Sequence, residues 1–345
     1  MSVLVIGDPH FDPKHLSTID VFTSQILHYV STKKPGAVFV MGDILHTFEK
    51  ARVECHTRAV KWFKDMAAYS HVVVLIGNHD RPNPNVFLTK EHFFTGIECD
   101  NLVIVDDAPY KMSMSKGDKV RTFVAVPYVP KGRLHEVFKR LDRPNEPFDM
   151  KSVTAVFAHQ DIMGAKMGAV VCRDGDVWPA DYPLLINGHY HEHQELGDNI
   201  FMPGTPYQTT YSEEVKKGIY LFDWWKADKD PKQLITSIKL NIRIKCSKTV
   251  TVDEFLHMPA PDVTFDLRIV VQGEQQDVEA CKKSKKYKDF TKLKHVKVVL
   301  VPILKMVEKK KRVDVSKTYV ALIYNEIQSD PDMLSVFTEL LKDFQ

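Results

Sequence analysis

Residues 37–46 read AVFVMGDILH, an apolar run that ends in a glycine and an aspartate. The run has the length and the β-branched content of a buried strand, and Gly-Asp is typical of the turn that ends one. Residues 2–8 (SVLVIGD) and residues 71–78 (HVVVLIGN) repeat the arrangement on either side of it. These segments predict three buried strands, each of which ends in polar side chains.

The stretches between these strands have helical spacing. Apolar side chains recur at helical intervals in residues 16–32 and 51–69, which predicts two amphipathic helices. The resulting β-α-β-α-β order favours an α/β fold. Further apolar runs lie close together with turn residues between them, which suggests antiparallel pairing. They are LVIV, TFVAV, VTAVFA, PLLIN, NIFM and GIYLFDW.

Composition divides the chain into three parts. Residues 1–245 hold the strands and helices just described. Residues 246–312 contain FDLRIVVQG, a lysine-rich helical stretch and HVKVVLVPI, which together predict a small β-α-β domain. Residues 313–345 predict two amphipathic helices, at 316–328 and 331–343, separated by Ser-Asp-Pro. We expect a large α/β domain, a small α/β domain and a helical tail.

Bulk properties exclude few classes of function. The chain has 345 residues, a net charge of +2 and five scattered cysteines without a C-x-x-C pair. Such a charge does not indicate a nucleic-acid partner, and the cysteine pattern is not that of a disulfide framework. The apolar run at the N-terminus lacks the features of a signal peptide, and no run is long enough to span a membrane. An intracellular, soluble protein is expected.

Five polar motifs each follow an apolar run. They are Asp8-Pro9-His10, Gly42-Asp43-Ile44-Leu45-His46, Gly77-Asn78-His79-Asp80, His159 and Gly188-His189-Tyr190-His191. Each motif alone is more simply explained as a turn or as a buried histidine, except that His-x-His after a strand is unusual. All five together require another explanation, because the carboxyl ends of strands in an α/β sheet meet at one edge.

The side-chain types of these motifs indicate metal chemistry. Aspartate, asparagine and histidine together suit Mn²⁺, Fe²⁺ or Zn²⁺, and Mg²⁺ is a further candidate. Two ions ~3.5–4 Å apart can bind one phosphate and activate water, and a carboxylate can bridge them. The set contains no cysteine, which argues against a structural zinc site. The motifs therefore predict a two-metal phosphoesterase.

Over residues 1 to about 225, the ordered motifs resemble those of the calcineurin-like metallophosphoesterase superfamily. The resemblance implies a four-layer α/β/β/α sandwich and two divalent ions, with Mn²⁺ as the first choice. It also implies how the side chains share the ions: Asp8, His10 and His191 on one, Asn78, His159 and His189 on the other, and Asp43 between them. His79 would be the histidine that stabilises charge or protonates the leaving oxygen.

Within the superfamily, the chain is most similar to SbcD-type DNA-repair nucleases in their compact, phage-like form. His46 would be a second active-site histidine that helps to present the DNA phosphate. Residues 203–206 (Pro-Gly-Thr-Pro) resemble a segment that these nucleases carry after their His-x-His. The resemblance implies Mn²⁺-dependent DNA exonuclease and endonuclease activity, homodimerisation, and an SMC-like ATPase partner bound by the C-terminal helices. Phe11-Asp12 departs from the Leu-Gly that usually follows the first histidine in these nucleases, in a loop expected near the DNA path.

The sequence leaves alternatives for the activity, for the lysine-rich surface and for the tail helices. A phosphomonoesterase would use the same ligands, and a non-catalytic scaffold could keep the fold. His193 is interpreted as an exposed loop histidine rather than a further ligand. The lysines between 282 and 297, and the basic run 309–312, form either a solvated surface or a phosphate-binding one. The tail helices pack on their own domain or, as we favour, against a coiled coil of the ATPase.

Overall fold

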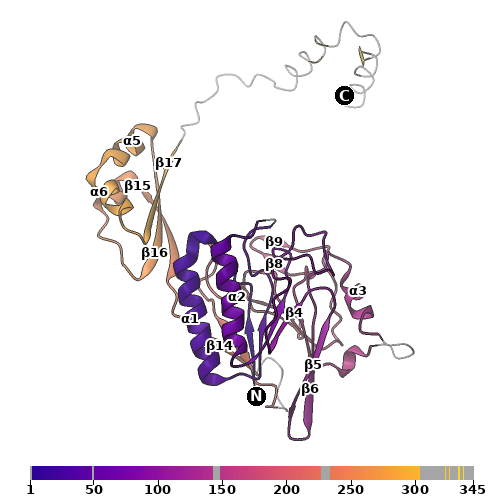
Figure 1. Ribbon diagram of the computed structural model, residues 1–345. Coiled ribbons are helices and arrows are strands. Elements are labelled where there is room, and N and C mark those ends of the chain that lie inside the picture. Colours follow the sequence, from indigo (N-terminus) through magenta and orange to yellow (C-terminus); the bar gives the residue numbers. More distant parts are fainter. Residues whose placement is uncertain are drawn as a thin grey trace. The chain divides into compact units, whose positions relative to one another are not determined.

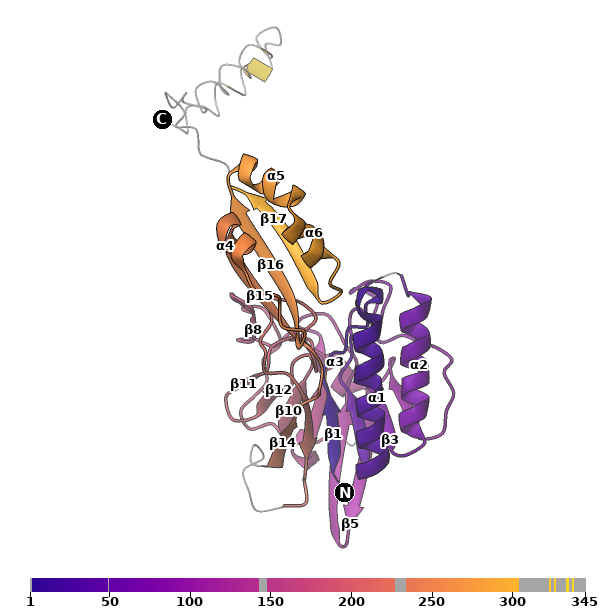
Figure 2. The same ribbon diagram turned by 90° about the vertical axis from the view of Figure 1, so that its left-hand side faces the viewer.

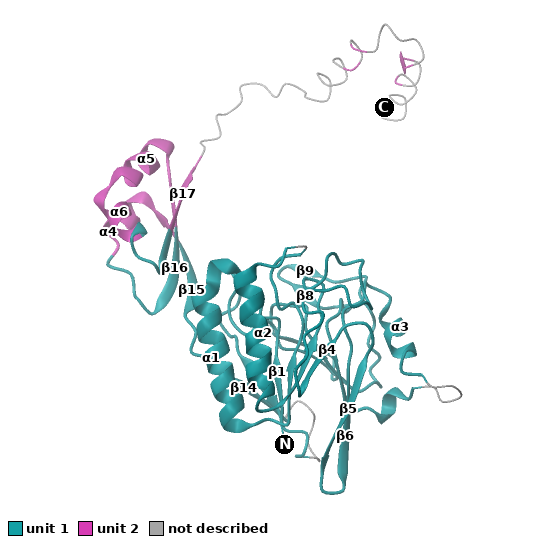
Figure 3. Ribbon diagram, viewed as in Figure 1, with its two compact units in different colours: residues 1–248, 259–269, 291–297 teal, residues 249–258, 270–290, 298–345 magenta. Residues whose placement is uncertain are grey.

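The structure is a computed structural model that describes residues 2–48, 50–142, 148–226 and 234–303, with five single residues beyond them: Ile323, Glu326, Met333, Leu334 and Phe337. The predicted tail helices and the basic run 309–312 lie outside these described residues, apart from the five. The chain divides into two compact units (Figure 3): unit 1 is 1–248, 259–269 and 291–297, and unit 2 is 249–258, 270–290 and 298–345. The domain boundaries expected from composition stay predictions.

A six-stranded sheet contains the three strands predicted first. Its order is β14-β13-β1-β2-β3-β4. The strands are β1 (Val3–Ile6), β2 (Ala37–Val40), β3 (His71–Leu75), β4 (Leu102–Val105), β13 (Ile219–Phe222) and β14 (Ile235–Ile238). Strands β1 to β4 are parallel, and β13 is antiparallel to both β1 and β14. The crossovers are α1 (Leu16–Lys33) and α2 (Val53–Ala67), close to the predicted helices (Figure 1).

A second six-stranded sheet has the order β11-β12-β10-β7-β6-β5. Its strands are β5 (Tyr110–Lys116), β6 (Lys119–Ala125), β7 (Ala155–Ala158), β10 (Leu184–Asn187), β11 (Gln194–Leu196) and β12 (Ile200–Met202). The expected antiparallel pairing is wrong for most of this sheet, because β6, β7, β10 and β12 pair in parallel. Long connections return the chain to the same end of the sheet before each of these strands begins.

Three apolar layers hold these elements together. The first packs α1 and α2 against one face of the first sheet, with Phe22 and Trp62 at its centre. The second lies between the sheets, where the Phe39 and Phe157 rings stack with centroids 3.7 Å apart. The third covers the outer face of the second sheet and includes Val137 from α3 (Leu134–Lys139). The predicted α/β/β/α arrangement is confirmed, and buried apolar area is its main stabilising term.

The C-terminal sheet has the order β15-β16-β17. It is formed by β15 (Ile244–Thr251), β16 (Phe265–Gly273) and β17 (Val296–Pro302), and the helices are α4 (Val252–His257), α5 (Gln275–Lys283) and α6 (Lys285–Thr291) (Figure 2). Within unit 2, the Phe255 and Phe290 rings are in edge contact at 5.4 Å. The predicted β-α-β unit is present, whereas β15 and α4 were not anticipated. No helix in the described part of the chain is long and apolar enough to cross a membrane.

Candidate metal centre

The loops that follow β1, β2, β3, β7 and β10 carry the five predicted motifs. Three of the non-glycine residues in these loops adopt left-handed backbone: His10 (φ 43°), Asp43 (φ 47°) and His189 (φ 76°). Such backbone costs about 1–3 kcal/mol at each residue and persists where surrounding structure imposes it. The loops turn sharply, and this brings side chains from both sheets together.

One group of side chains converges on Asp43 from the side of β7 and β10. His159 Nε2 lies 3.3 Å from Asp43 Oδ1 and 3.1 Å from Asn78 Oδ1. His189 Nδ1 lies 3.2 Å from the same Asn78 oxygen. Asp43, His159 and His189 are close enough for one cation to contact all three. These residues are the predicted second set with its bridging aspartate.

A second group meets Asp43 from the other side. His10 Nε2 is 3.8 Å from Asp43 Oδ2, and the His10 and His191 rings are 4.6 Å apart. His10 is 3% exposed, yet neither of its ring nitrogens has a hydrogen-bond partner. Asp8 Oδ1 is likewise buried without a hydrogen-bond partner, at 3.7 Å from His159 Nδ1, while Asp8 Oδ2 accepts from the backbone N–H of His189 at 2.6 Å. Buried polar atoms without partners carry a desolvation cost, which a divalent cation would remove.

Two glycines of the motifs occupy positions where any side chain would collide with a predicted ligand. A Cβ at Gly77 would lie 2.2 Å from Asp43 Oδ1, and one at Gly188 would lie 2.6 Å from Asp8 Oδ1. Both glycines therefore allow backbone to approach a carboxylate closely. Together with the unpaired atoms, this close packing fits a pair of divalent ions held by oxygen and imidazole donors.

Each of three predicted ligand histidines has an oxygen acceptor near its second ring nitrogen. His159 Nδ1 is 2.7 Å from the carbonyl oxygen of Met41. His189 Nε2 is 3.3 Å from Asp161 Oδ1, and His191 Nδ1 is 3.5 Å from Glu213 Oε1. Such partners fix which nitrogen is free to bind a metal. Neither carboxylate was predicted from the sequence to have a role. For Asp161, its position two residues after His159 could have suggested one.

Burial and charge shift the protonation of this cluster. Burial acts to raise the pKa of Asp43, but the charge of His159 and a hydrogen bond from the same ring hold it well below its ordinary value. Burial raises the pKa of Asp8 to about 6. Burial lowers the pKa of His10 well below its ordinary value, which leaves a neutral imidazole. A neutral imidazole and an ionised aspartate are the forms that bind metal ions.

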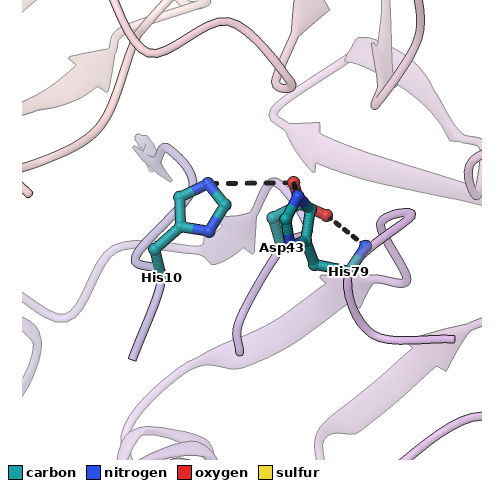
Figure 4. A group of neighbouring side chains, drawn as sticks. All are labelled: His10, Asp43 and His79. Carbon is teal, nitrogen blue, oxygen red and sulfur yellow. Dashed lines mark hydrogen bonds and ion pairs between the residues drawn. The ribbon is translucent and has the colours of Figure 1, made fainter. Parts of the chain in front are cut away.

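His79 lies at the open side of the centre. Its Nδ1 is 2.8 Å from the carbonyl oxygen of His46, so Nδ1–H donates there and Nε2 is left free. That Nε2 is 3.9 Å from Asp43 Oδ2, and Figure 4 shows His10, Asp43 and His79 side by side. The Phe48 ring stacks on His79 with centroids 4.0 Å apart, a contact that the sequence did not suggest.

His46 is placed beside His79 rather than among the buried ligands. Its side chain is 41% exposed, and its Nε2 is 3.8 Å from Asp12 Oδ2. The His46 and His79 rings are nearly parallel, with centroids 6.3 Å apart. The predicted second active-site histidine thus lies at the entrance to the centre, where a phosphate group could reach it.

His193 is not part of the centre. Its Nδ1 is 2.8 Å from the carbonyl oxygen of Met202, and its ring stacks on Tyr220 at 5.3 Å. His193 lies in the loop before β11, as expected, but it is not an exposed residue. Its side chain is 22% exposed, and its ring contacts Phe201 of β12 and Tyr220 of β13.

Asp80 holds the ligand loops together. It is fully buried, and its carboxylate accepts from the backbone N–H groups of Ile44 (2.9 Å), Leu45 (3.1 Å) and Gly77 (3.1 Å).

We expect Asp80→Asn to lower the free energy of unfolding by about 1–3 kcal/mol, because an amide nitrogen would face a donor that it cannot satisfy. Urea denaturation of the metal-free protein measures this effect. Asp100→Asn, at an exposed carboxylate, is the control, and equal midpoints for the two variants would contradict the assignment.

Comparisons with known proteins agree with the motifs. The model of the family described as calcineurin-like phosphoesterase matches residues 1–265. The chain is 36% identical over 220 residues to putative phosphoesterase 078R of Invertebrate iridescent virus 3, covering 64% of this chain and 61% of that protein. It is 33% identical over 285 residues to putative phosphoesterase 244L of Invertebrate iridescent virus 6, covering 82% and 98%. Yfce, a phosphoesterase from E. coli, aligns over 70% of this chain and 100% of that chain with 12% identity and a TM-score of 0.31.

Proposed function

The chain belongs to the calcineurin-like phosphoesterase family, and from this premise we propose that it is a two-metal phosphodiesterase that cleaves DNA. The observation that carries the proposal is the convergence of ligand-type side chains from both sheets on Asp43. His159 and His10 approach its two carboxylate oxygens from opposite sides, at 3.3 and 3.8 Å. A bridging carboxylate between two histidine-rich groups suits a pair of cations bound to one phosphate.

Seven of the residues would bind the metal ions, and His79 would act on the leaving group. Asp8, His10 and His191 would hold one ion, Asn78, His159 and His189 the other, and Asp43 both. Two divalent ions, with Mn²⁺ as our choice, would supply Lewis-acid chemistry at the phosphorus centre. The Nδ1–H bond from His79 to the carbonyl of His46 leaves Nε2 facing the centre. From the imidazolium form of the ring, Nε2 would donate its proton to the leaving oxygen or stabilise charge on it.

DNA is the proposed substrate because of the arrangement around His79. A phosphodiester presents two non-bridging oxygens and two ester oxygens. Because both ester oxygens continue into the strand, a second donor at the entrance can contact the phosphate or the strand beyond it. His46 supplies such a donor, since its half-exposed ring lies parallel to that of His79. Docking to an SMC-like ATPase stays a prediction, because the helices that would carry it lie outside the described residues.

Cleavage assays test the proposal. The full-length protein is stripped of metal and assayed with and without Mn²⁺ on single-stranded DNA, on duplex ends and on an aryl phosphate monoester. We expect Mn²⁺-dependent DNA cleavage that exceeds monoester turnover. Monoester turnover far above that of every DNA substrate would replace the proposal with a phosphomonoesterase. Failure to bind any divalent ion would favour a non-catalytic scaffold.

Glu213 is expected to position His191. Its carboxylate is buried, accepts from Thr205 Oγ1 at 3.2 Å and pairs with Lys217 Nζ at 3.1 Å, in addition to its contact with His191. Glu213→Gln should weaken binding of one metal ion about 10–100-fold, because a carboxylate behind a ligand histidine raises its basicity and fixes its orientation. Calorimetric titration with Mn²⁺ measures the affinity. Glu98→Gln, at an exposed position, should leave it unchanged, and an unaltered affinity in Glu213→Gln protein that circular dichroism shows to be folded would refute the role.

A further inference from the structure

Exposed apolar side chains are concentrated in one short stretch of unit 1. Among the described residues, sixteen large apolar side chains are exposed, and five of them lie between residues 163 and 177. The five are Met163 (46% exposed), Met167 (50%), Val170 (69%), Val171 (43%) and Val177 (65%). Scattered exposed apolar residues are normal, but a local concentration of this kind marks a binding surface.

The stretch forms a hairpin of two short strands, β8 (Lys166–Met167) and β9 (Val170–Val171), labelled in Figure 1. The strands pair antiparallel, with Met167 opposite Val170, and Gly168 begins the turn with a φ of 58°. Gln194 fixes the first strand, since its side chain bonds both the N–H and the carbonyl of Lys166 at 2.8 Å. The apolar side chains are therefore held in place on a defined element.

The hairpin forms one wall of a cavity of about 600 Å³. The wall is Met167, Val170 and Val171, and the cavity is also lined by Asp161 and Tyr190. Asp161 is the carboxylate whose Oδ1 lies 3.3 Å from His189 Nε2 in the metal centre. The cavity therefore adjoins the predicted second metal-binding group directly, and its volume is in the range of small-molecule sites.

The cavity lining carries two cations and two carboxylates, and one cation is left for a ligand because Asp161 lies against His189. Lys131 Nζ is paired with Asp174 at 3.0 Å, so that cation is already neutralised. Arg173 also lines the cavity, and it makes no hydrogen bond or ion pair with any residue that the structure describes. The apolar wall can contact a base, and the Arg173 guanidinium can pair with a neighbouring phosphate of the strand. The adjoining metal centre would hold the phosphate that reacts.

We propose that this cavity binds the nucleobase adjacent to the scissile phosphodiester. The proposal rests on the function proposed above and names a subsite for its substrate. The aliphatic wall contacts the flat face of the base. The Tyr190 hydroxyl is bonded to the backbone of Ile162, at 3.2 Å from its N–H and 3.3 Å from its carbonyl oxygen, so it is not directed at a base edge. Recognition through faces rather than edges tolerates all four bases.

The test compares two esters with the same leaving group. Thymidine 5′-(p-nitrophenyl phosphate) carries a base, and methyl p-nitrophenyl phosphate does not. Val170→Asp places a charge on the cavity wall, and Val177→Asp does the same at an equally exposed valine outside it. We expect Val170→Asp to lower the ratio of kcat/KM for the thymidine ester to that for the methyl ester about tenfold, mainly through KM, as is usual for a lost apolar contact. Val177→Asp should keep the wild-type ratio.

A binding experiment tests the subsite without requiring that the protein hydrolyse either ester. Equilibrium dialysis of the Mn²⁺-loaded protein compares thymidine 5′-monophosphate with inorganic phosphate. A wild-type preference for the nucleotide that Val170→Asp removes supports the subsite, even if neither ester is hydrolysed and the proposed function fails. An unchanged ester ratio together with an unchanged preference overturns the subsite. Loss of self-association in Val170→Asp, seen by light scattering with nucleotide affinity intact, also overturns it and assigns the hairpin to contact between copies of the chain.

Discussion

Asp43→Asn is expected to abolish phosphodiester cleavage, with kcat reduced at least about a thousandfold. Asp43 is the residue that both proposed ligand groups share, since His159 and His10 approach its two oxygens. Asparagine keeps the size of the side chain but replaces one anionic oxygen with a donor that cannot bind a cation. The Mn²⁺ content of the purified variant, measured by inductively coupled plasma mass spectrometry, should fall from about two ions towards none or one.

The loss must be separated from unfolding. Asp43 Oδ1 also accepts from the backbone N–H of His79 at 2.9 Å, so the substitution could loosen that loop. Thermal denaturation without metal measures this contribution. Asp118→Asn, on the exposed turn between β5 and β6, controls for the change in net charge. Full metal content with lost activity would contradict the bridging role of Asp43.

The positions of the ligands could be predicted because strand ends leave a local signal. AVFVM, HVVVLI and PLLIN are buried on both faces, so their apolar runs are continuous and end where polar residues begin. Parallel strands of one sheet then bring those ends to a common edge. The sequence thus contained both the fold class and the residues that the structure places around Asp43.

Other features depend on contacts that no local pattern records. The parallel order of β6, β7, β10 and β12 is set by where long loops return, and loops carry no periodicity. Glu213 reaches His191 across 22 positions of sequence, and Phe48 stacks on a histidine from a different loop. A carboxylate or phenyl ring on a turn is common in any protein. Only the folded chain shows which of them face the metal centre.

His79→Asn is expected to lower kcat for DNA about 10²–10⁴-fold while the Mn²⁺ content stays at the wild-type value. The backbone N–H of His79, which bonds Asp43, is unaffected by the substitution. The asparagine amide can still donate to the carbonyl of His46, so the loop should keep its conformation. What is lost is Nε2, the one ring nitrogen that faces the open side of the centre.

The identity of the leaving group separates the two roles that remain for His79. DNA cleavage expels an alkoxide that needs a proton, whereas a p-nitrophenyl ester expels a stable phenolate. If His79 is the acid, His79→Asn should harm the p-nitrophenyl ester at least about tenfold less than DNA. An equal loss on both would assign it to charge stabilisation.

Loss of a metal ion would make His79 a ligand, in line with its 3.9 Å approach to Asp43. His28→Asn, on the exposed face of α1, should change none of these values.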